Sequence, residues 1–307
     1  MNERVRQQGY IRLAKALHKK DDEFFTSHYD ANLYLQQIAE HFKGKVIYCN
    51  CDNPAYSAIA KWFCRNYNKL QLKGLYCSYY NPNVEFTTYA YKYDGVNWHR
   101  KRLKGQGSYD DAELLPILRA CDIVVTNPPF SKCAAFCNYL IANNIKFIVI
   151  SNIAIISNST LHFLRYLHFI FTPNRQRLYL NSANKLLLYN GKHKVHLGMV
   201  NWLTNMPEVD KREKCWPLAK YDLKVHRPFD NWECCINVNR LADTPCDYNG
   251  LMAVPITILS KKLAFDYTII GIVSSSHNPR PEKQFFCPKL MQGGRRVFTR
   301  LLILRTQ

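Results

Sequence analysis

Four consecutive residues in the first half of the chain, Asn127, Pro128, Pro129 and Phe130, could form a cradle for a planar amine. An Asn side chain offers one carbonyl acceptor and one NH₂ donor, whereas a proline has no N–H and leaves its carbonyl as the main polar group. An exocyclic amine could donate one hydrogen to the side-chain oxygen of Asn127 and the other to the carbonyl oxygen of Pro128. The ring of Phe130 offers a face on which the flat ring that carries the amine can stack.

The residues around this tetrapeptide predict a strand before it and a helix after it. Residues 122–126 form a short apolar, β-branched run, which is typical of a buried parallel strand. Ser131 is expected to cap the helix that follows. The apolar positions of that helix are Ala134, Phe136, Cys137, Leu140 and Ile141. Open α/β sheets bind ligands at the carboxyl ends of their strands, so the position suits a site, although a rigid turn without chemistry is the alternative.

The composition is that of a basic globular protein. The chain has 307 residues, of which 47% are hydrophobic, enough for one large domain or for a core with a smaller lobe. Lys and Arg number 42 against 23 acidic residues, and the net charge of +19 favours a polyanion partner such as nucleic acid. Residues 151–307 hold 22 of the basic and 10 of the acidic residues, so the second half is the expected main phosphate-contacting region. A soluble basic protein without such a partner is the alternative.

The 12 cysteines predict reduced thiols rather than disulfides or a metal site. None is spaced C-x₂-C, and Cys49, Cys121 and Cys137 lie in apolar runs, where a free Cys behaves as a small hydrophobe. No metal is expected. The charged N-terminus is unlike a signal peptide, and no apolar run approaches the roughly 18 residues that a membrane span needs. A cytoplasmic protein without a membrane partner is therefore expected.

Predicted strands and helices alternate in the first half, which is typical of a parallel sheet. Strands are expected at 45–50, 72–80 and 146–150, helices at 1–20, 30–42, 55–66 and 110–120, and a β-hairpin over 86–98. The basic run 99–107 is expected to be a loop, either against a DNA backbone or in solvent. Beyond residue 175, short strand-like pieces (176–180, 185–189 and 195–203) and many prolines predict an irregular, β-rich region.

The first strand leads into Cys51, Asp52, Asn53 and Pro54. A carboxylate at the end of the first strand, where the first helix of the sheet opens, suits the binding of a cationic amine. A Gly-rich loop is common at this place in enzymes that bind nucleotide-like cofactors, and this chain has none.

An Asn-Pro-Pro-Phe turn after a strand resembles the signature of amino-methyltransferases that use S-adenosylmethionine. More of the chain resembles one group of these enzymes, the EcoRI family of adenine-specific DNA methyltransferases. The resembling segments are DEFFT (22–26), VIYCNCDNP (46–54), CDIVVTNPPFS (121–131), FIVISN-x-A (147–154), NWLTNM (201–206), DYNGLMAVPITIL (247–259) and VFTRLLIL (297–304). They extend from about residue 20 to the end, and CNCDNP in place of a Gly-rich loop is particular to this family.

The resemblance implies an α/β fold, a class I (Rossmann-like) methyltransferase core with a mostly parallel sheet. This S-adenosylmethionine-binding and catalytic core is expected over 1–206, and an irregular β-rich region over 207–307 is expected to contribute to DNA target recognition. The implied reaction transfers a methyl group from S-adenosylmethionine to N6 of adenine in a specific double-stranded DNA sequence, with the target base flipped out of the duplex. The resemblance also implies a monomer and a place in restriction–modification.

The resemblance assigns roles to individual residues. The catalytic residues are Asn127, Pro128, Pro129 and Phe130. The cofactor-binding residues are Phe24, Phe25, Thr26, Asn50, Cys51, Asp52, Asn53 and Pro54, with Ser108, Asp110 and Asp122 as alternatives for contact with the cofactor's adenine. The substrate contacts are expected from residue type and charge and not from the resemblance: Trp202 is a candidate for stacking on the second face of the flipped base, and the candidates for contact with DNA are Arg100, Arg102, Arg175, Arg177, Arg295 and Arg296.

Two other functions remain open at this point. The first keeps the reaction but changes the acceptor to an RNA adenine or a protein glutamine amide, since any planar amine could fit the cradle. The charge disfavours glutamine, and the resemblance disfavours RNA. The second is a DNA-binding relative without catalysis, which is left open by the missing Gly-rich loop and by Ser108, where the family tends to carry an acidic residue.

Overall fold

The structure, a computed structural model, divides the chain into two compact units, Met1–Ile155 with Leu167–Asp210 and Ile156–Tyr166 with Lys211–Gln307. The residues that it describes are 25–81, 87–152, 155, 167–170, 179–180, 200–210, 214–215, 219–260, 262–263, 266–273 and 290–306. The expected helix at 1–20 and the expected strand at 185–189 lie outside these residues. The assignment of residues 207–307 to target recognition stays a prediction.

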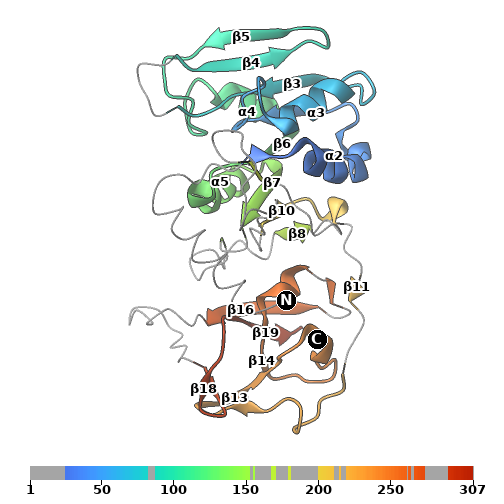
Figure 1. The fold of residues 1–307 in the computed structure, drawn as a ribbon, viewed down its shortest axis with the longest axis vertical. Coiled ribbons are helices and arrows are strands. Elements are labelled where there is room, and N and C mark those ends of the chain that lie inside the picture. The colour runs from blue at the N-terminus through green and yellow to red at the C-terminus, as the bar shows by residue number, and fades with distance from the viewer. Residues whose placement is uncertain are drawn as a thin grey trace, which may run out of the picture. The chain divides into compact units, whose positions relative to one another are not determined.

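The first unit is built on an eight-stranded sheet with the order β5-β4-β3-β2-β6-β7-β10-β8 (Figure 1). Its strands in chain order are β2 (Val46–Cys49), β3 (Gly74–Cys77), β4 (Tyr89–Tyr93), β5 (Trp98–Arg102), β6 (Ile123–Thr126), β7 (Lys146–Asn152), β8 (His168–Ile170) and β10 (Val200–Thr204). The neighbours β3, β2, β6 and β7 run parallel, whereas β4 and β10 run against them. The prediction of an α/β fold with a large, mostly parallel sheet is therefore confirmed.

The helices of this unit follow its strands, as the alternating pattern predicted. They are α2 (His28–Gln37), α3 (Ala58–Asn66), α4 (Leu115–Ala120) and α5 (Phe130–Ala142), with 3₁₀ helices at Ala39–Phe42 and Pro207–Val209. Ser57 caps α3, because its hydroxyl accepts the N–H of Ala60 at 3.1 Å. None of the helices in the described ranges is long and apolar enough to span a membrane.

The start of α5 differs from the sequence-based prediction. The helix begins at Phe130, and the residue before it, Pro129, has extended backbone angles (φ −53°, ψ 130°). Ser131 therefore lies inside the first turn, and the prediction that it caps the helix is wrong. The reason is that a proline has a fixed φ and no N–H, so it can precede the first turn directly without a polar cap.

The basic run after the hairpin also differs from its prediction. Its first residues belong to β5, which pairs with β4 from Tyr89↔Arg102 to Tyr93↔Trp98. The turn between the strands is closed by Asp94, whose Oδ1 accepts the N–H groups of Val96 at 2.8 Å and Asn97 at 2.7 Å. Backbone pairing at the margin of a sheet tolerates charged side chains, because these side chains remain in solvent. The prediction of a loop over 99–107 is therefore wrong for residues 99–102, which belong to β5.

The core of the first unit lies between the sheet and its helices. Ile47, Ile123 and Ile148 come from three adjacent strands and are fully buried. Phe42 and Phe63 meet edge to face with ring centroids 4.9 Å apart. Aromatic pairs in this geometry add about 0.5–1.5 kcal/mol to the effect of burial. The packing fixes the strand ends from which the site is built.

The second unit has its own sheet of five strands, with the order β12-β13-β14-β19-β16. These strands are β12 (Pro228–Phe229), β13 (Trp232–Asn237), β14 (Leu251–Pro255), β16 (Tyr267–Val273) and β19 (Arg300–Arg305). Smaller pieces are the strand pair β17 (Met291–Gln292) and β18 (Arg295–Arg296), the pair β11 (Lys214–Cys215) and β15 (Lys262–Leu263), and 3₁₀ helices at Leu241–Asp243 and Ile256–Ser260. Phe229, Cys235 and Leu302 form part of its buried core. A β-rich second region was predicted and is observed.

Candidate functional site

A pocket of about 100 Å³ opens at the carboxyl ends of β2, β3 and β6. Its lining includes Cys51 and Asp52 after β2, Tyr79 and Tyr80 after β3, Asn127, Pro128 and Pro129 after β6, and Thr26 from β1 (Phe25–Thr26). The chain passes from β2 to β3 on one side, while β6 lies on the other side of β2. Such a switch in strand order is where open α/β sheets bind their ligands.

The carboxylate of Asp52 is held between two hydroxyl groups beneath this pocket. Its Oδ1 accepts a hydrogen bond from Ser57 Oγ at 2.5 Å, and its Oδ2 accepts one from Thr126 Oγ1 at 2.6 Å. The backbone N–H of Asn127 also donates to it. Burial raises the pKa of Asp52, and the hydrogen bonds from Ser57, Thr126 and Asn127 act in the opposite direction. We call Asp52, Ser57 and Thr126 the Asp52 network.

The Asp52 network joins the end of β2, the start of α3 and the end of β6. Ser57 belongs to the start of α3, and Thr126, 74 residues from Asp52, is the last residue of β6. The hydroxyl of Thr126 also accepts the N–H of Cys51 at 2.9 Å. The residue after Thr126 is Asn127, so the network fixes the backbone from which the expected catalytic turn starts.

A second set of hydrogen bonds fixes the turn after β2. The N–H of Asp52 donates to the carbonyl of Ser78 at 2.8 Å, and the N–H of Ser78 donates to the carbonyl of Cys49 at 3.1 Å. The hydroxyl of Ser78 donates to the carbonyl of Asn50 at 3.1 Å and lies 2.7 Å from the hydroxyl of Tyr48. These hydrogen bonds, from hydroxyl side chains and from the segment after β3, fix the conformation of the turn. The turn therefore does not need glycine residues, which explains why a Gly-rich loop is missing here.

Two buried polar atoms near the pocket have no hydrogen-bond partner in the described part of the chain. They are Oγ1 of Thr26 and Nδ2 of Asn50. Buried polar groups in folded proteins are almost always paired, so an unpaired one indicates a missing ligand or water. Thr26 lines the pocket, and both residues were among the expected cofactor-binding residues.

Comparison with known proteins places the chain in a family. The profile described as "Adenine-specific methyltransferase EcoRI" matches residues 12–285. The chain belongs to this family. Three curated relatives are all named type II methyltransferases, and comparison with solved structures gives no significant match.

The relatives cover most of this chain and most of their own length. M.EcoRI of Escherichia coli is 34% identical over 281 residues, which are 81% of this chain and 85% of that protein. M.MgeORF184P of Mycoplasma genitalium is 29% identical over 95% of this chain and 98% of its own length. M.MpnI of Mycoplasma pneumoniae is 27% identical over 80% of this chain and 81% of its own length. Methyl transfer and restriction–modification are thus properties of the group to which the chain belongs.

Some of the residues that the EcoRI-family resemblance assigned to the cofactor come together in the structure. Thr26, Cys51 and Asp52 line one pocket with the Asn127–Pro129 turn. Asn53 shapes the same chain segment, because its Oδ1 accepts the N–H of Ala55 at 2.9 Å, and Pro54 follows it. Phe24 and the side chain of Phe25 lie outside the described residues.

The alternatives for contact with the cofactor's adenine are placed differently from one another. Ser108 donates to Asp110 at 2.5 Å, in a loop whose Gly107 packs against the carbonyl of Tyr79. Asp122 is exposed at the opposite end of β6, where its Oδ2 accepts the N–H of Val46 at 2.7 Å. Asp122 therefore does not line the pocket beside the Asn127 turn, because the whole length of β6 separates it from that turn.

Trp202 cannot play the role that the sequence suggested. It is only 1% exposed and stacks on Tyr34, with ring centroids 4.5 Å apart and planes at 14°. The hydrophobic β10 strand faces the core here, so the indole is part of the packing of the first unit. The expectation that Trp202 stacks on a flipped base is wrong.

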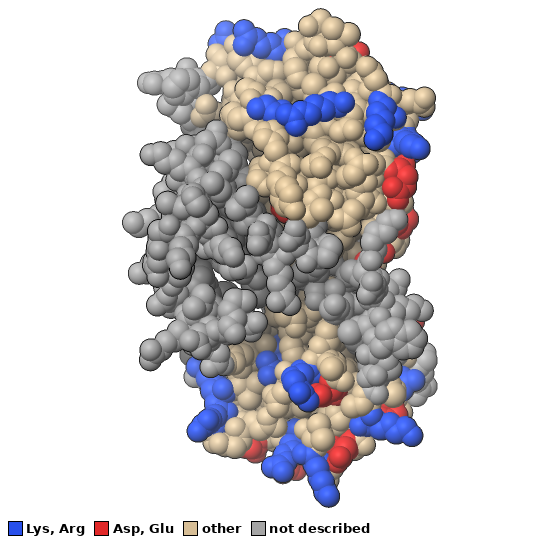
Figure 2. Space-filling view, turned by 45° about the vertical axis from the view of Figure 1, so that its right-hand side comes forward, with Lys and Arg blue, Asp and Glu red and all other residues tan. Residues whose placement is uncertain are grey.

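The expected DNA-contacting arginines lie at the surface wherever the structure describes them. Arg100 and Arg102 are exposed on β5, and the guanidinium of Arg100 lies 4.7 Å from the ring centroid of Tyr89. Arg295 and Arg296 are exposed on β18. Figure 2 shows Lys and Arg side chains on the described surface of each unit. Arg175 and Arg177 lie outside the described residues.

Several residues of the site were missed by the sequence reasoning. Tyr56, Tyr79 and Tyr80 line the pocket, and Ser57 and Thr126 hold Asp52. The signal for Ser57 was its position just before the apolar run of α3, where an N-cap residue is expected. Thr126 was read only as a strand residue, since a single sequence does not show which strand ends are neighbours.

Proposed function

We propose that the protein transfers a methyl group from S-adenosylmethionine to N6 of adenine in a specific double-stranded DNA sequence. The observation that carries the proposal is the pocket in which the Asn127–Pro129 turn meets Asp52 at the switch in strand order. Membership of the EcoRI methyltransferase family supports the reaction. A class I methyltransferase core is part of the proposal, and the parallel order β3-β2-β6-β7 supports it.

The residues at the pocket fit S-adenosylmethionine, which supplies an electrophilic methyl group on a cationic sulfur. The buried carboxylate of Asp52 provides negative charge beside the pocket, which suits a cationic ligand. The hydroxyl of Thr26 has no hydrogen-bond partner among the described residues and could bind a polar group of the cofactor. Tyr56, Tyr79 and Tyr80 offer aromatic faces for its adenine ring.

The Asn127 turn would bind the target amine. The side-chain oxygen of Asn127 and the carbonyl oxygen of Pro128 would accept its two hydrogens, so that the nitrogen lone pair faces the methyl donor. Catalysis would then rest on positioning and on preorganised hydrogen-bond acceptors. The target base must leave the duplex to reach this turn, which costs a few kcal/mol. Stacking on Phe130 would offset part of that cost, with about 1–3 kcal/mol per base.

The proposal is tested by single-molecule sequencing of DNA from cells that express the protein or its Asn127→Ala variant. We expect N6-methyladenine at one sequence motif with the wild type and none with the variant. Binding of S-adenosylmethionine by the variant, measured by calorimetry, should be close to that of the wild type. This control shows that the loss of methylation does not come from unfolding.

Three results would contradict the proposal. Methylation by Asn127→Ala at the wild-type rate would remove the assigned role of the turn. Labelled methyl groups found in RNA or in protein, and not in DNA, would identify a different acceptor. A folded wild type that binds no S-adenosylmethionine would point to a binding protein without catalysis.

A further inference from the structure

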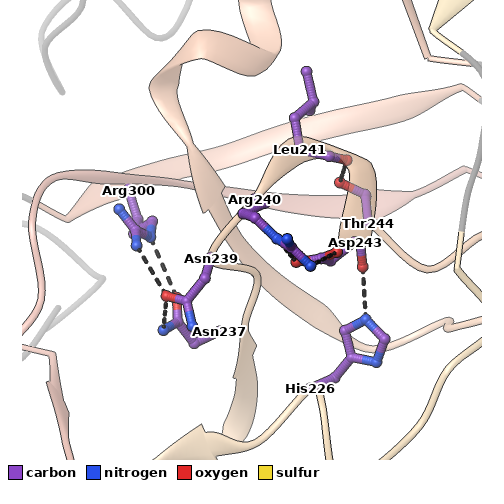
Figure 3. Close-up of polar contacts among 8 residues, drawn as sticks. All are labelled: His226, Asn237, Asn239, Arg240, Leu241, Asp243, Thr244 and Arg300. Atoms are coloured by element: carbon purple, nitrogen blue, oxygen red, sulfur yellow. Dashed lines mark hydrogen bonds and ion pairs between the residues drawn. The ribbon is translucent and has the colours of Figure 1, made fainter. Parts of the chain in front are cut away.

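The first residue of β19 in the second unit, Arg300, is a half-buried cation held by uncharged acceptors. Its Nε donates to Oδ1 of Asn237 at 3.2 Å and its Nη2 to Oδ1 of Asn239 at 3.5 Å (Figure 3). No carboxylate of the described chain pairs with it. Burying a charge without an opposite charge is costly, so such a group is expected to have a functional reason.

A neighbouring arginine shows the ordinary arrangement for comparison. Arg240 is 79% exposed and forms a bidentate pair with Asp243, with distances of 2.8 and 3.0 Å (Figure 3). The Asp243 pair raises the pKa of Arg240, whereas burial lowers the pKa of Arg300. The two side chains therefore differ in whether the protein itself neutralises them.

Asn237 fixes the groups around Arg300. Its buried amide donates from Nδ2 to Asn239 Oδ1 at 2.9 Å and to Gln292 Oε1 at 2.5 Å, while its Oδ1 accepts from Arg300. Its backbone N–H donates to the carbonyl of Arg227 at 3.0 Å. All polar atoms of the Asn237 side chain are thus used inside the protein, and it serves to orient its neighbours.

The hydrogen-bonding capacity that remains on Arg300 and Asn239 consists of donors. The Oδ1 of Asn239 already accepts two hydrogen bonds, which leaves its NH₂ group as a donor on an exposed residue. A guanidinium has five N–H donors and no acceptor, and Arg300 uses two of them in the contacts above. A ligand for Arg300 and Asn239 must therefore bring acceptors, and the positive charge favours an anionic one.

We propose that Arg300 and Asn239 form a contact site for double-stranded DNA in the second unit. The acceptors would be phosphate oxygens or the O6 and N7 atoms of a guanine, which are the groups that Arg and Asn side chains bind on DNA. Arg295 and Arg296 lie exposed on β18, which pairs with the strand of Gln292, so further positive charge lies close by in the same unit. The inference rests on the proposed function.

The first test compares Arg300→Gln with Arg240→Gln in the full-length protein. The probe is a duplex that carries the methylation motif found by sequencing, in competition with the same duplex lacking it, over a series of salt concentrations. Arg300→Gln should weaken binding roughly 5- to 150-fold, and Arg240→Gln by much less. Equal behaviour of the two variants would overturn the inference.

The same series separates the two kinds of acceptor. If Arg300 binds a phosphate, affinity falls for both duplexes, the salt slope decreases by about 1, and Arg300→Lys restores most of the binding. If it binds a guanine, the variants lose discrimination at one position of the motif, and Arg300→Lys does not restore it, because Lys lacks the bidentate fork.

A second variant distinguishes the loss of a DNA contact from the loss of the folded structure. Asn239→Asp places a carboxylate 3.5 Å or less from Arg300, where it would neutralise that charge. We expect a raised Tm together with at least a 10-fold weaker affinity for DNA, because the new carboxylate competes with the DNA acceptors. Unchanged affinity in this stabilised variant would overturn the inference. A wild type that neither binds nor methylates DNA would refute the proposed function itself.

Discussion

Removal of one hydroxyl from the Asp52 network should show whether it positions the catalytic turn. Thr126→Val keeps the shape of the side chain but deletes the donor to Asp52 Oδ2 and the acceptor for the N–H of Cys51. A hydrogen bond to a charged group contributes about 1.5–3 kcal/mol, and an unpaired buried N–H costs about 1–3 kcal/mol. These terms are not additive, so we expect the free energy of unfolding to fall by about 3–4 kcal/mol.

Thr204 offers a matched control on another strand of the same sheet. Its hydroxyl donates to the carbonyl of Phe147 at 2.7 Å and accepts the N–H of Met206 at 3.1 Å, and it is fully buried. Thr204→Val therefore loses the same number of bonds without involving a carboxylate. Urea unfolding should show that Thr126→Val is more destabilising by about 1 kcal/mol, the difference between a charged and a neutral hydrogen bond.

Activity separates a positioning role from a merely structural one. Thr126→Val should lower kcat more than it raises KM for the cofactor, Thr126→Ser should restore both, and Thr204→Val should leave the kcat of the folded enzyme unchanged. If both Val variants unfold at the same urea concentration and methylate at the wild-type rate, the reasoning about the Asp52 network is refuted.

The pH dependence of stability gives an independent readout of the same network. The pKa of Asp52 is raised above its ordinary value of 3.8, mainly by burial. An acid with a raised pKa in the folded state contributes stability below the unfolded value, and this contribution is lost as the pH rises through the folded pKa. Thr126→Val removes one of the hydrogen bonds that lower the pKa of Asp52, so this pKa should be higher in the variant than in the wild type. The free energy of unfolding of the variant should therefore fall further than that of the wild type as the pH rises above 3.8. Asp52→Asn should abolish this difference.

Two further changes test the surroundings of the site. Gly107 has φ +76°, and an added Cβ would lie 2.4 Å from the carbonyl oxygen of Tyr79, whereas Gly44 has φ +66° and open space. Gly107→Ala should therefore lower cofactor affinity in calorimetry and be more destabilising than Gly44→Ala; equal effects would contradict the close packing. Trp202→Ala should cost about 3–5 kcal/mol of stability in urea unfolding. Trp202→Phe should keep DNA affinity, and a 10-fold loss in a stable Trp202→Phe protein would reinstate a base-stacking role.

The elements around the site could be predicted because their signals are local. The apolar runs that became β2, β6 and β7 are short and β-branched, and the turn residues Pro128 and Pro129 end the strand before them. The hydrophobic pattern of α3 was likewise predicted, although its start was placed at residue 55 rather than after the cap at Ser57. Local signals do not set boundaries well, so α5 begins at Phe130 rather than after Ser131.

The parts that could not be predicted depend on contacts between distant residues. Thr126 meets Asp52 only because β6 pairs with β2 in the register Ile47↔Ile123. The burial of Trp202 could not be predicted for the same reason. It results from stacking on Tyr34, which is far away in the sequence, and the residues next to Trp202 do not show whether its side chain is exposed or buried. Asp122 is a different case, because the sequence already places it before β6 and therefore at the amino end of that strand, away from the Asn127 turn.

The basic strand β5 lies at the margin of the large sheet in the described part of the chain. A marginal strand presents unpaired N–H and C=O groups that can pair with another molecule and start aggregation. Four of its five residues, His99 to Arg102, are exposed and basic in type, so two copies of the strand repel each other. This repulsion weakens as salt shortens the screening length to about 3 Å at 1 M. The charges on β5 thus disfavour edge-to-edge pairing of two copies of this strand at physiological salt, whether or not any of them touches DNA.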